Sequence, residues 1–285
     1  MSLKTVVAWC SDSNYRKLLE VSFYSFAINN KNSKAYIIKY DDFNEDNLIA
    51  IAEEYNIELL FFKLTDDDLP PIGRYSRAMY GRLYLTELIN DEVFIYLDCD
   101  TIITSNLNSL INTRLGINNI SMLKEKNTNI IKNRLSSLDI NDYFNSGVIV
   151  ISNSLSTKKN MRDVINYIKK NIDILVYPDQ DALNVIFSNK IKKLDSKYNY
   201  IYPKKSNEMP IIIHYAHEKP WLPLNNNYYS YIYFDLIDDG YRYMLSEYSP
   251  IQLSKNYIII KFFKNILKKL NIISLIQFIK WRIVK

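Results

Sequence analysis

The chain has 285 residues, of which 48 % are hydrophobic and 24 % are charged, a balance typical of globular proteins. Two cysteines, Cys10 and Cys99, are too few for a disulfide framework or for a zinc site made of cysteine ligands. Because no apolar run reaches about 18 residues, we expect no membrane-spanning helix. Met1–Cys10 predicts a first strand rather than a signal peptide, so the cytoplasm is the expected location.

The net charge of +5 is unevenly distributed. Residues 251–285 contain eight basic residues and no acidic ones, and removing those eight from the 36 Lys and Arg leaves 28 against 31 acids elsewhere. The body of the chain is therefore slightly acidic. A body of this sign lacks the basic footprint of a nucleic-acid-binding protein, and we expect no such partner.

Apolar runs and helical patterns alternate along the first third of the chain. Strands are predicted at Thr5–Trp9, Ala35–Tyr40, Ile57–Leu64 and Val93–Leu97, and helices at Tyr15–Ile28, Asn44–Tyr55 and Tyr75–Ile89. Asn44 is a suitable N-cap for the second helix. This order predicts an α/β fold whose sheet is largely parallel.

The later elements are fewer. Strands are predicted at Ile120–Leu123, Gly147–Ile151 and Ile211–Ile213, and helices at Thr157–Asn171 and Asp179–Phe187. The stretch Tyr228–Tyr243 is aromatic and irregular, and no element is predicted there. The sequence thus divides into a body, residues 1–249, and a tail, residues 250–285.

The tail has the pattern of a basic amphipathic helix. Its apolar positions follow spacings of four and three, with lysines on the opposite face: Ile259, Phe263, Ile266, Leu270 and Ile273 against Lys261, Lys264 and Lys268. Such a helix either lies on an anionic membrane surface or packs on the body with its lysines in solvent. The absence of acids favours the membrane.

Polar residues follow three predicted strands: Ser11-Asp12-Ser13-Asn14-Tyr15, Asp98-Cys99-Asp100 and His214-Tyr215. Ligands of open α/β sheets bind beyond the carboxyl ends of strands. In an extended backbone, residues two apart face the same side, so Asp98 and Asp100 can present two carboxylates to one cation. If the strands are sheet neighbours, His214 joins them, and two carboxylates with one imidazole suit Mn²⁺ better than Mg²⁺.

Each of these groups also has a purely structural explanation. Asp98 and Asp100 can begin a turn, His214 can be a hydrogen-bonded core residue, and Asp12 and Asn14 can cap the next helix. Two other triplets fit the same spacing, Asp66-Asp67-Asp68 and Asp179-Gln180-Asp181. The joint placement of the first groups at strand ends favours a common site.

Three further features extend this candidate site. Asn145-Ser146-Gly147 precedes a predicted strand, where Gly147 permits close backbone approach to a ligand or simply makes a turn. Asp179 and Asp181 open a helix after Pro178, where acids also suit the helix dipole. Arg82, on the helix predicted at Tyr75–Ile89, faces either a phosphate or solvent.

Together these segments resemble the motifs of glycosyltransferase family 8, the retaining GT-A enzymes, and particularly the bacterial lipooligosaccharide galactosyl- and glucosyltransferases. The matching segments follow the family order: Ser11–Tyr15, Ala78–Leu83, Phe94–Asp100, Tyr143–Val148, Asp179–Asn184, and His214-Tyr215 followed by Lys219-Pro220-Trp221. The resemblance spans about residues 5–222. It implies a GT-A fold, a single Rossmann-like nucleotide-sugar-binding domain over residues 1–249, followed by the amphipathic tail.

The resemblance also implies roles. Asp98, Asp100 and His214 would bind Mn²⁺, with Mg²⁺ as the alternative, and the metal would bridge the diphosphate of a UDP-sugar. Asp12, Asn14 and Tyr15 would hold the uridine, and Lys219 the diphosphate. The donor sugar would be held by Arg82, Asn145 and Asp179, with Cys99, Ser146 and Gly147 in the same donor-binding segments. Gln180 would lie near the anomeric carbon, opposite the leaving group, and Glu125 in the acceptor site.

The chemistry of Gln180 narrows the mechanism. A neutral amide is a poor covalent nucleophile, because it lacks the carboxylate that a retaining glycosidase uses. We therefore expect front-face attack in which the departing phosphate takes the acceptor's proton; retention and an α-linkage are implied by the resemblance alone. One departure concerns His214 to Lys219, which is one residue shorter than the family pattern and lacks its glycine. This departure puts the diphosphate contact of Lys219 in question.

The expected activity is transfer of glucose or galactose to a glycan, with a lipid-linked acceptor at the inner membrane face fitting the basic tail. Two alternatives stay open. A sugar nucleotidyltransferase would carry a glycine-rich phosphate loop near its first strand, yet no glycine precedes Gly73. A non-catalytic, membrane-associated carbohydrate-binding protein would not need the complete set Asp98, Asp100, His214 and Gln180.

Overall fold

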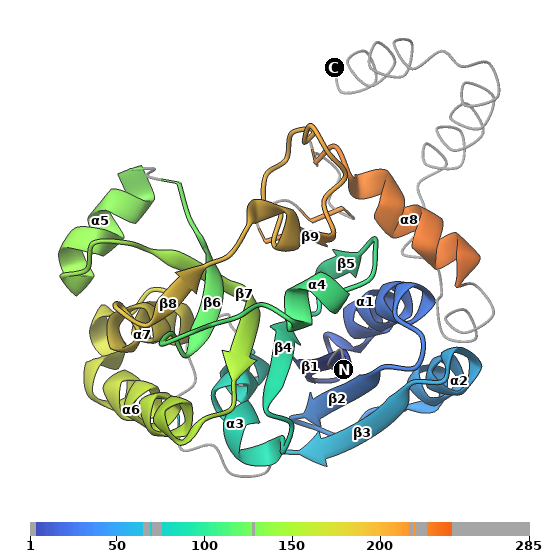
Figure 1. Cartoon of the computed structure of the whole chain (residues 1–285), viewed down its shortest axis with the longest axis horizontal. Helices are drawn as coiled ribbons and strands as arrows, with labels where there is room; N and C mark the ends of the chain where they lie inside the picture. Colours follow the sequence, from blue (N-terminus) through green and yellow to red (C-terminus); the bar gives the residue numbers. More distant parts are fainter. Residues whose placement is uncertain are drawn as a thin grey trace.

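A seven-stranded sheet forms the centre of the protein (Figure 1). The computed structural model describes residues 4–64, 69, 76–126, 129–216, 219–220 and 227–240. The strand order is β3-β2-β1-β4-β7-β6-β8. These strands are β1 (Val6–Ser11), β2 (Lys34–Lys39), β3 (Glu58–Lys63), β4 (Val93–Leu97), β6 (Ile120–Lys124), β7 (Phe144–Ser152) and β8 (Ile191–Lys193).

The sheet is mostly parallel, as predicted. β1 pairs in parallel with β2 and β4, β2 with β3, and β6 with β8. β7 alone runs the other way, antiparallel to both β4 and β6. In Figure 1 the arrow of β7 points down, so β4 ends toward the top of the molecule. The carboxyl ends at which a ligand is expected therefore lie at the top.

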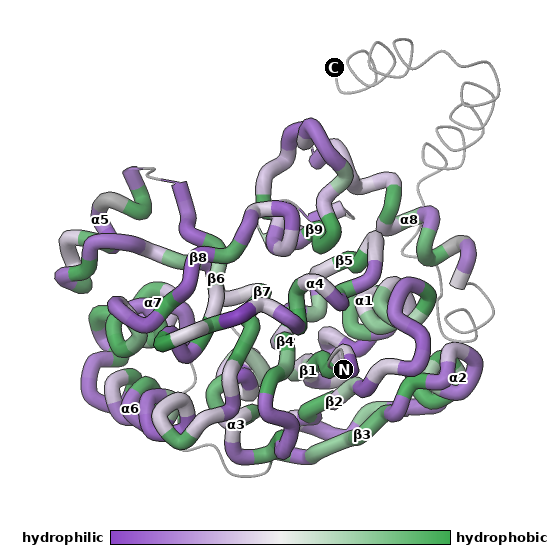
Figure 2. The backbone as a smooth tube through the Cα atoms, in the orientation of Figure 1, coloured by the Kyte–Doolittle hydropathy of each residue, from purple (hydrophilic) through white to green (hydrophobic). Residues whose placement is uncertain are grey.

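Helices cover both faces of the sheet and create two hydrophobic cores. One face packs on α1 (Arg16–Asn29) and α2 (Asp46–Tyr55), the other on α6 (Leu155–Asn171) and α7 (Pro178–Ile186). The residues of β1 divide between the two cores, with Trp9 in the first and Ala8 in the second. Burial on both faces explains the continuous apolar runs of the central strands. Figure 2 shows α2 and α6 alternating hydrophilic and hydrophobic residues, as expected of helices with one face on a core.

A second, two-stranded sheet lies over the first core. β5 (Thr101–Ile103) pairs antiparallel with β9 (Ile212–His214), and Thr101 is opposite His214. The strand that ends at His214 is therefore not a neighbour of β4 in the main sheet, which was the condition under which the sequence joined His214 to Asp98 and Asp100. The chain turns after Asp98, where the Thr101 N–H donates to the Asp98 carbonyl at 3.2 Å, and β5 then offers β9 a pairing edge away from the main sheet.

Other boundaries differ from the predicted ones for local reasons. The helix expected at Tyr75–Ile89 is a 3₁₀ helix, η1 (Arg77–Leu83), followed by the short α3 (Leu85–Leu88). Glycine is required in η1, because a Cβ at Gly81 would lie 2.7 Å from the Cys10 sulfur. β7 begins at Phe144, so Asn145, Ser146 and Gly147 lie within the strand rather than before it.

The start of α2 also differs. This helix begins at Asp46, two residues after the predicted start, with Glu45 at the N-cap position. The Asn44 side chain still accepts the Asp46 N–H at 2.7 Å, so it caps the helix from one residue further away.

Several elements carried no prediction. Most are short or mostly polar, and α8 lies in the aromatic stretch. They are α4 (Asn108–Ile111), α5 (Asn129–Leu138), η2 (Ile172–Ile174), η3 (Ser196–Tyr198) and α8 (Ser230–Asp239), together with the strands β5 and β8. The tail at residues 250–285 and the triplet at residues 66–68 lie outside the described residues. Among the described residues, no helix is both long and apolar enough to span a membrane.

A buried hydrogen-bond chain joins the main sheet to the turn after β4. The Trp9 indole N–H donates to the Ser22 hydroxyl at 3.0 Å, and the Ser22 hydroxyl lies 3.0 Å from that of Thr101. The Thr101 hydroxyl in turn donates to the Asp98 carbonyl at 2.7 Å. Ser22 therefore accepts from Trp9 and donates to Thr101, which fixes the start of β5 against α1.

We predict that Ser22→Ala lowers the free energy of unfolding by about 1–3 kcal/mol, because it leaves the buried Trp9 N–H without an acceptor. Chemical denaturation of both proteins measures the difference. Ser136→Ala, at an exposed position of α5, is the matched control and should change stability by less than about 0.5 kcal/mol. Equal effects of the two substitutions would contradict a structural role for this chain of hydrogen bonds.

Candidate active site

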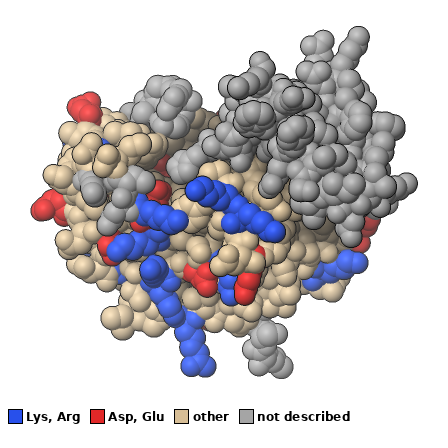
Figure 3. All heavy atoms as spheres, turned by 90° about the horizontal axis from the view of Figure 1, so that it is seen from above, with Lys and Arg blue, Asp and Glu red and all other residues tan. Residues whose placement is uncertain are grey.

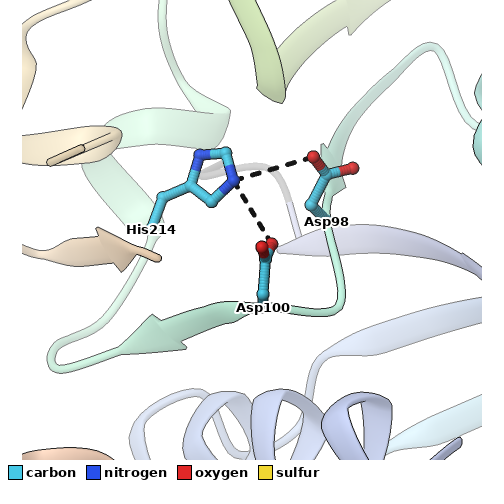
Figure 4. Close-up of side chains that lie close together, drawn as sticks. All are labelled: Asp98, Asp100 and His214. Atoms are coloured by element: carbon cyan, nitrogen blue, oxygen red, sulfur yellow. Dashed lines mark ion pairs between the residues drawn. The ribbon is translucent and has the colours of Figure 1, made fainter. Parts of the chain in front are cut away.

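Asp98, Asp100 and His214 converge at the top of β4 (Figure 4). The His214 Nε2 atom lies 3.2 Å from Asp100 Oδ1 and 3.7 Å from Asp98 Oδ2. One ligand atom from each residue lies within 4.8 Å of the other two. Two carboxylate oxygens and one imidazole nitrogen at these separations fit a divalent cation of the Mn²⁺ type. The predicted convergence therefore occurs, through β5 and β9 rather than through the main sheet.

The imidazole ring occupies space that only a glycine leaves open. A Cβ at Gly147 would lie 2.0 Å from the His214 Cε1 atom, far closer than atoms can approach. Gly147 is in β7, next to the end of β4, and its N–H donates to the Asn145 side-chain oxygen at 3.0 Å. The requirement for glycine here comes from close packing on His214.

Arg82 connects the segments of the site. Its side chain is buried, with the residue 6 % exposed, and its guanidinium lies 2.7 Å from Asp98 Oδ1 and 3.2 Å from Asp179 Oδ2. It also donates to the Ser146 carbonyl and hydroxyl at 2.9 and 2.8 Å. The prediction that Arg82 faces solvent, one of two alternatives, was wrong, because its side chain is buried. A buried guanidinium needs partners such as these.

The two oxygens of Asp98 have different surroundings. Oδ1 accepts from Arg82 and, at 2.6 Å, from the hydroxyl of Tyr96. Oδ2 is the atom that faces His214. Asp98 therefore has one oxygen held by protein donors and one directed toward the cluster, as a monodentate metal ligand requires.

Each carboxylate oxygen of Asp100 faces a different basic side chain. Its Oδ2 atom forms an ion pair with the Lys219 ammonium, and its Oδ1 atom faces His214. Burial by itself would raise the pKa of Asp100, but His214 and Lys219 outweigh burial and hold that pKa well below its usual range. Lys219 thus reaches the cluster despite the shortened segment that precedes it.

Asp179 and Gln180 begin α7 beside Arg82. Asp179 is buried, and burial raises its pKa although Arg82 opposes this effect. The Gln180 side-chain oxygen accepts from the Ser146 N–H at 2.9 Å, while its Nε2 donates to the Tyr143 hydroxyl at 3.1 Å. Both ends of the Gln180 amide are therefore fixed.

In the triplet Asp179-Gln180-Asp181, the last residue has a structural role. Asp181 is fully buried, pairs with Arg134 and accepts from the Tyr143 hydroxyl at 2.6 Å. Its other oxygen accepts the Val176 and Tyr177 N–H groups, at 2.9 and 3.1 Å. Asp181 thus anchors the start of α7 and holds the Tyr143 hydroxyl that supports Gln180.

The residues after β1 border the cluster. The Asp12 carboxylate accepts from the Tyr15 N–H at 3.0 Å and from the Ser76 hydroxyl, so it fixes the turn into α1. Asn14 and Tyr15 are exposed, Tyr15 to 44 %. Burial of part of its ring raises the pKa of Tyr15, with Lys219 opposing and Asp100 adding to the shift, so Tyr15 lies close to both.

Cys99 differs from its neighbours in the triplet. Its side chain is buried and its sulfur donates to the Cys10 carbonyl at 3.3 Å. Burial raises the pKa of this thiol well above its usual value, so it stays protonated. Only the backbone of Cys99 is placed to meet a ligand.

The side chain of Asn145 forms hydrogen bonds with Glu125 and Asn199, two contacts that the sequence did not predict. Its amide nitrogen lies 3.4 Å from Glu125 Oε1, and its oxygen accepts from the side chain of Asn199 at 2.9 Å. Asn199 follows η3 and contacts His214. The sequence predicted no part in the site for Asn199, and it gave no role to Tyr96 and Tyr143 although both lie in segments that match the family, since ordinary polar residues in irregular or buried segments carry no local signal of function.

An α/β sheet of this topology, with two acids and a histidine at its carboxyl edge, has the arrangement that the resemblance to GT-A glycosyltransferases implies. A family model, glycosyl transferase family 8, matches residues 6–225, and the chain belongs to this family. Lipopolysaccharide 1,2-glucosyltransferase of Escherichia coli K12 is 28 % identical, over 75 % of this chain and 72 % of that protein. A putative glycosyltransferase of Haemophilus influenzae is 30 % identical, over 74 % and 70 %.

Solved structures show the same fold. The galactosyltransferase LgtC, crystallised with donor and acceptor sugar analogues, superposes with a TM-score of 0.72 at 19 % identity, covering 82 % of this chain and 96 % of LgtC. The glycosyltransferase GlyE of Streptococcus pneumoniae gives 0.68 at 21 % identity, covering 86 % and 63 %. The predicted family and the predicted GT-A fold are both confirmed, and the protein is a glycosyltransferase.

We predict that Gly147→Ala weakens Mn²⁺ binding at least about 10-fold, because the added methyl group must displace the His214 ring. Isothermal titration calorimetry of the metal-free protein measures the affinity, and the circular dichroism spectrum shows whether the fold persists.

Gly116→Ala is the matched control. A Cβ there meets nothing within 4 Å, although φ is +64°, so the substitution strains the backbone without touching the cluster. It should destabilise the protein by about 1 kcal/mol and leave Mn²⁺ affinity unchanged. Wild-type affinity in folded Gly147→Ala would show that the position of the His214 ring is irrelevant to metal binding.

Proposed function

We propose that the protein is a retaining hexosyltransferase that moves glucose or galactose from a UDP-sugar to a glycan acceptor, with Mn²⁺ as its metal and Mg²⁺ as the alternative. The observation that carries this proposal is the convergence of Asp98, Asp100 and His214 beside Lys219, at the carboxyl edge of a family 8 fold. Relatives named lipopolysaccharide 1,2-glucosyltransferase and lipopolysaccharide 1,3-galactosyltransferase support a hexose donor and a glycan acceptor.

The donor atoms of the cluster fit a cation that also binds phosphate. Asp98 offers Oδ2, Asp100 offers Oδ1 and His214 offers Nε2, and these are three ligands of an ion that takes about six. The remaining positions suit diphosphate oxygens. When bound, such a metal supplies Lewis-acid stabilisation of the negative charge on the leaving diphosphate.

The basic residues of the site complement this charge. Lys219 pairs with Asp100 and is partly exposed, so its ammonium can turn to a diphosphate oxygen while it stays next to the cluster. In the view from above, Lys and Arg side chains gather across the middle of the described surface, with a few acids beside them (Figure 3). This face is the one toward which β4 ends, and its basic groups favour the approach of an anionic donor.

We assign donor contacts to the residues around Arg82 and β1. Arg82, Asp179 and Asn145 lie along one side of the cluster, where the Asp179 oxygen that Arg82 does not contact can accept from sugar hydroxyls. Ser146 and Gly147 contribute the adjacent backbone of β7. Asp12, Asn14 and Tyr15 hold uridine, with the half-exposed ring of Tyr15 against the base.

Gln180 acts as a positioned dipole near the anomeric carbon. Its amide is neutral and hydrogen-bonded at both ends, so it does not form a glycosyl ester. The acceptor hydroxyl therefore attacks from the face that the diphosphate leaves, its proton passes to the departing phosphate oxygen, and the configuration is retained. Glu125, next to Asn145, lines the acceptor side.

The deciding experiment is a panel of UDP-sugars assayed for metal-dependent release of UDP. We expect turnover of UDP-glucose or UDP-galactose with Mn²⁺, and a loss of at least about 100-fold in Asp100→Asn, because the variant removes one anionic ligand of the metal. The exposed Asp173→Asn is the matched control and should retain wild-type rates.

The outcomes separate the functions. Absence of both UDP binding and UDP release with every metal would overturn the transferase assignment and favour a non-catalytic carbohydrate-binding protein. Release of pyrophosphate from a nucleoside triphosphate and a sugar phosphate would identify a nucleotidyltransferase. Wild-type turnover by Asp100→Asn would show that Asp100 is no metal ligand.

We further propose that residues 1–249 form the catalytic domain and that residues 250–285 bind the anionic inner face of the cell membrane, where the chain would meet a lipid-linked acceptor. The eight basic residues and absence of acids in this tail support the proposal. Each lysine near such a surface contributes about 1 kcal/mol.

We predict that replacing Lys261, Lys264 and Lys268 by Gln in the full chain weakens binding to vesicles containing anionic lipid at least about 10-fold in a sedimentation assay. Neutral vesicles are the control, and deletion of residues 251–285 should abolish binding and raise solubility. Unchanged vesicle binding in both variants would refute the membrane role of the tail.

A further inference from the structure

Asn199 lies between the metal-facing and the sugar-facing parts of the site and is fully buried, with an exposure of 0 %. It is the residue that ends η3, and its position is fixed by the N–H that donates to the Ser196 carbonyl at 3.2 Å. We propose that Asn199 is a positioning residue that selects the ring tautomer of His214 and, with the other end of the same amide, orients Asn145. This inference rests on the function proposed above and adds a residue to its machinery.

The His214 side of the contact sets a tautomer. Asn199 Oδ1 lies 2.9 Å from His214 Nδ1. A carbonyl oxygen can only accept, so the Nδ1 atom carries a proton in this arrangement. In a neutral imidazole the lone pair then resides on Nε2, the atom that faces Asp98 and Asp100. Only that tautomer can donate electrons to a cation held by the two carboxylates.

The Asn145 side uses the nitrogen of the same amide. Asn199 Nδ2 donates to Asn145 Oδ1 at 2.9 Å, and the Gly147 N–H donates to the same oxygen at 3.0 Å. Because two donors converge on its oxygen, the Asn145 amide nitrogen points the other way, toward Glu125. Asn199 therefore fixes which end of Asn145 faces Glu125 and the neighbouring site.

The two contacts depend on one another. Rotating the Asn199 amide by half a turn would place its NH₂ group against the Nδ1–H of His214 and its oxygen against the oxygen of Asn145. The contact between the two amide oxygens would then be repulsive in a buried environment, where mismatched polar groups cost the most, and the NH₂ group would favour a lone pair rather than a proton on Nδ1. A single orientation satisfies both neighbours, so the metal-facing histidine and the sugar-facing asparagine are oriented together.

Two substitutions separate positioning from packing. Asn199→Asp retains an acceptor for His214 but loses the donor to Asn145, whereas Asn199→Leu loses both at similar volume. We expect Asn199→Leu to weaken Mn²⁺ binding about 10–100-fold, the usual effect of removing a group that orients a metal-bound histidine. Asn199→Asp should keep Mn²⁺ affinity within about 3-fold of wild type, because a carboxylate serves the same histidine contact, and should raise the KM for the UDP-sugar.

The direct readout is the tautomer of His214 in the metal-free protein. The chain has two histidines, so His217→Gln leaves His214 as the single imidazole in the long-range ¹H–¹⁵N spectrum. At a pH where the ring is neutral, we expect a larger share of the Nδ1–H form with Asn199 or Asp than with Leu. In the Leu variant the remaining acceptors of a ring proton are the Asp98 and Asp100 carboxylates, which face Nε2. Thermal melting shows that each variant is folded.

The buried Asn160 provides the matched control, because its amide also bridges side chains, with Nδ2 donating to Asn119 at 3.1 Å and Oδ1 accepting from Lys190 at 3.0 Å. Asn160→Leu should lower stability without changing Mn²⁺ affinity or the His214 tautomer. An unchanged tautomer and unchanged Mn²⁺ affinity in Asn199→Leu would overturn the proposal and leave the proposed function standing. If the wild-type protein binds no Mn²⁺ and releases no UDP, the function fails instead, and the tautomer spectrum still decides the role of Asn199.

Discussion

The pairing of β5 with β9 is the constraint on which the site depends. Asp98 ends a central strand, and the chain then turns at once into β5, so any strand that pairs with β5 arrives within reach of both acids. β9 does so in the register that sets His214 opposite Thr101. Backbone hydrogen bonds therefore bring together residues more than a hundred positions apart. A shift of one residue would turn the histidine to the other face of the small sheet.

The electrostatics of the site follow from this placement. Asp98, Asp100 and Asp179 are held close together at a largely buried edge, which would be unfavourable without compensating charge. Arg82 bridges two of these acids and Lys219 pairs with the third. The Tyr96 hydroxyl is a further partner of Asp98, and Met79 and Ser146 are further partners of Arg82. The fold thus holds the acids close together with their charges compensated. The lowered pKa of Asp100 keeps this carboxylate ionised, which is the form that binds a cation.

Much of the architecture could be predicted because periodicity reports it directly. The five-residue run of β4 was predicted at its observed bounds, and α1, α6 and α7 within a residue or two at each end. Elements that carry few apolar residues, such as β8, or that lie in an aromatic and irregular stretch, such as α8, gave no usable pattern. The 3₁₀ geometry of η1 also escaped prediction, as did the close packing of Gly81 on Cys10, which joins segments distant in sequence.

The sequence by itself determined the α/β class, the family and the three residues that meet in the cluster, because strand-end acids and motif order are local properties of the chain. Only the tertiary structure decided how these residues act on one another. It placed β9 outside the main sheet, buried Arg82 between two carboxylates, turned the Cys99 side chain into the core and put Asn199 against His214. Each of these outcomes depends on contacts between segments distant in sequence, and such contacts are set by packing and by the need to pair every buried polar group.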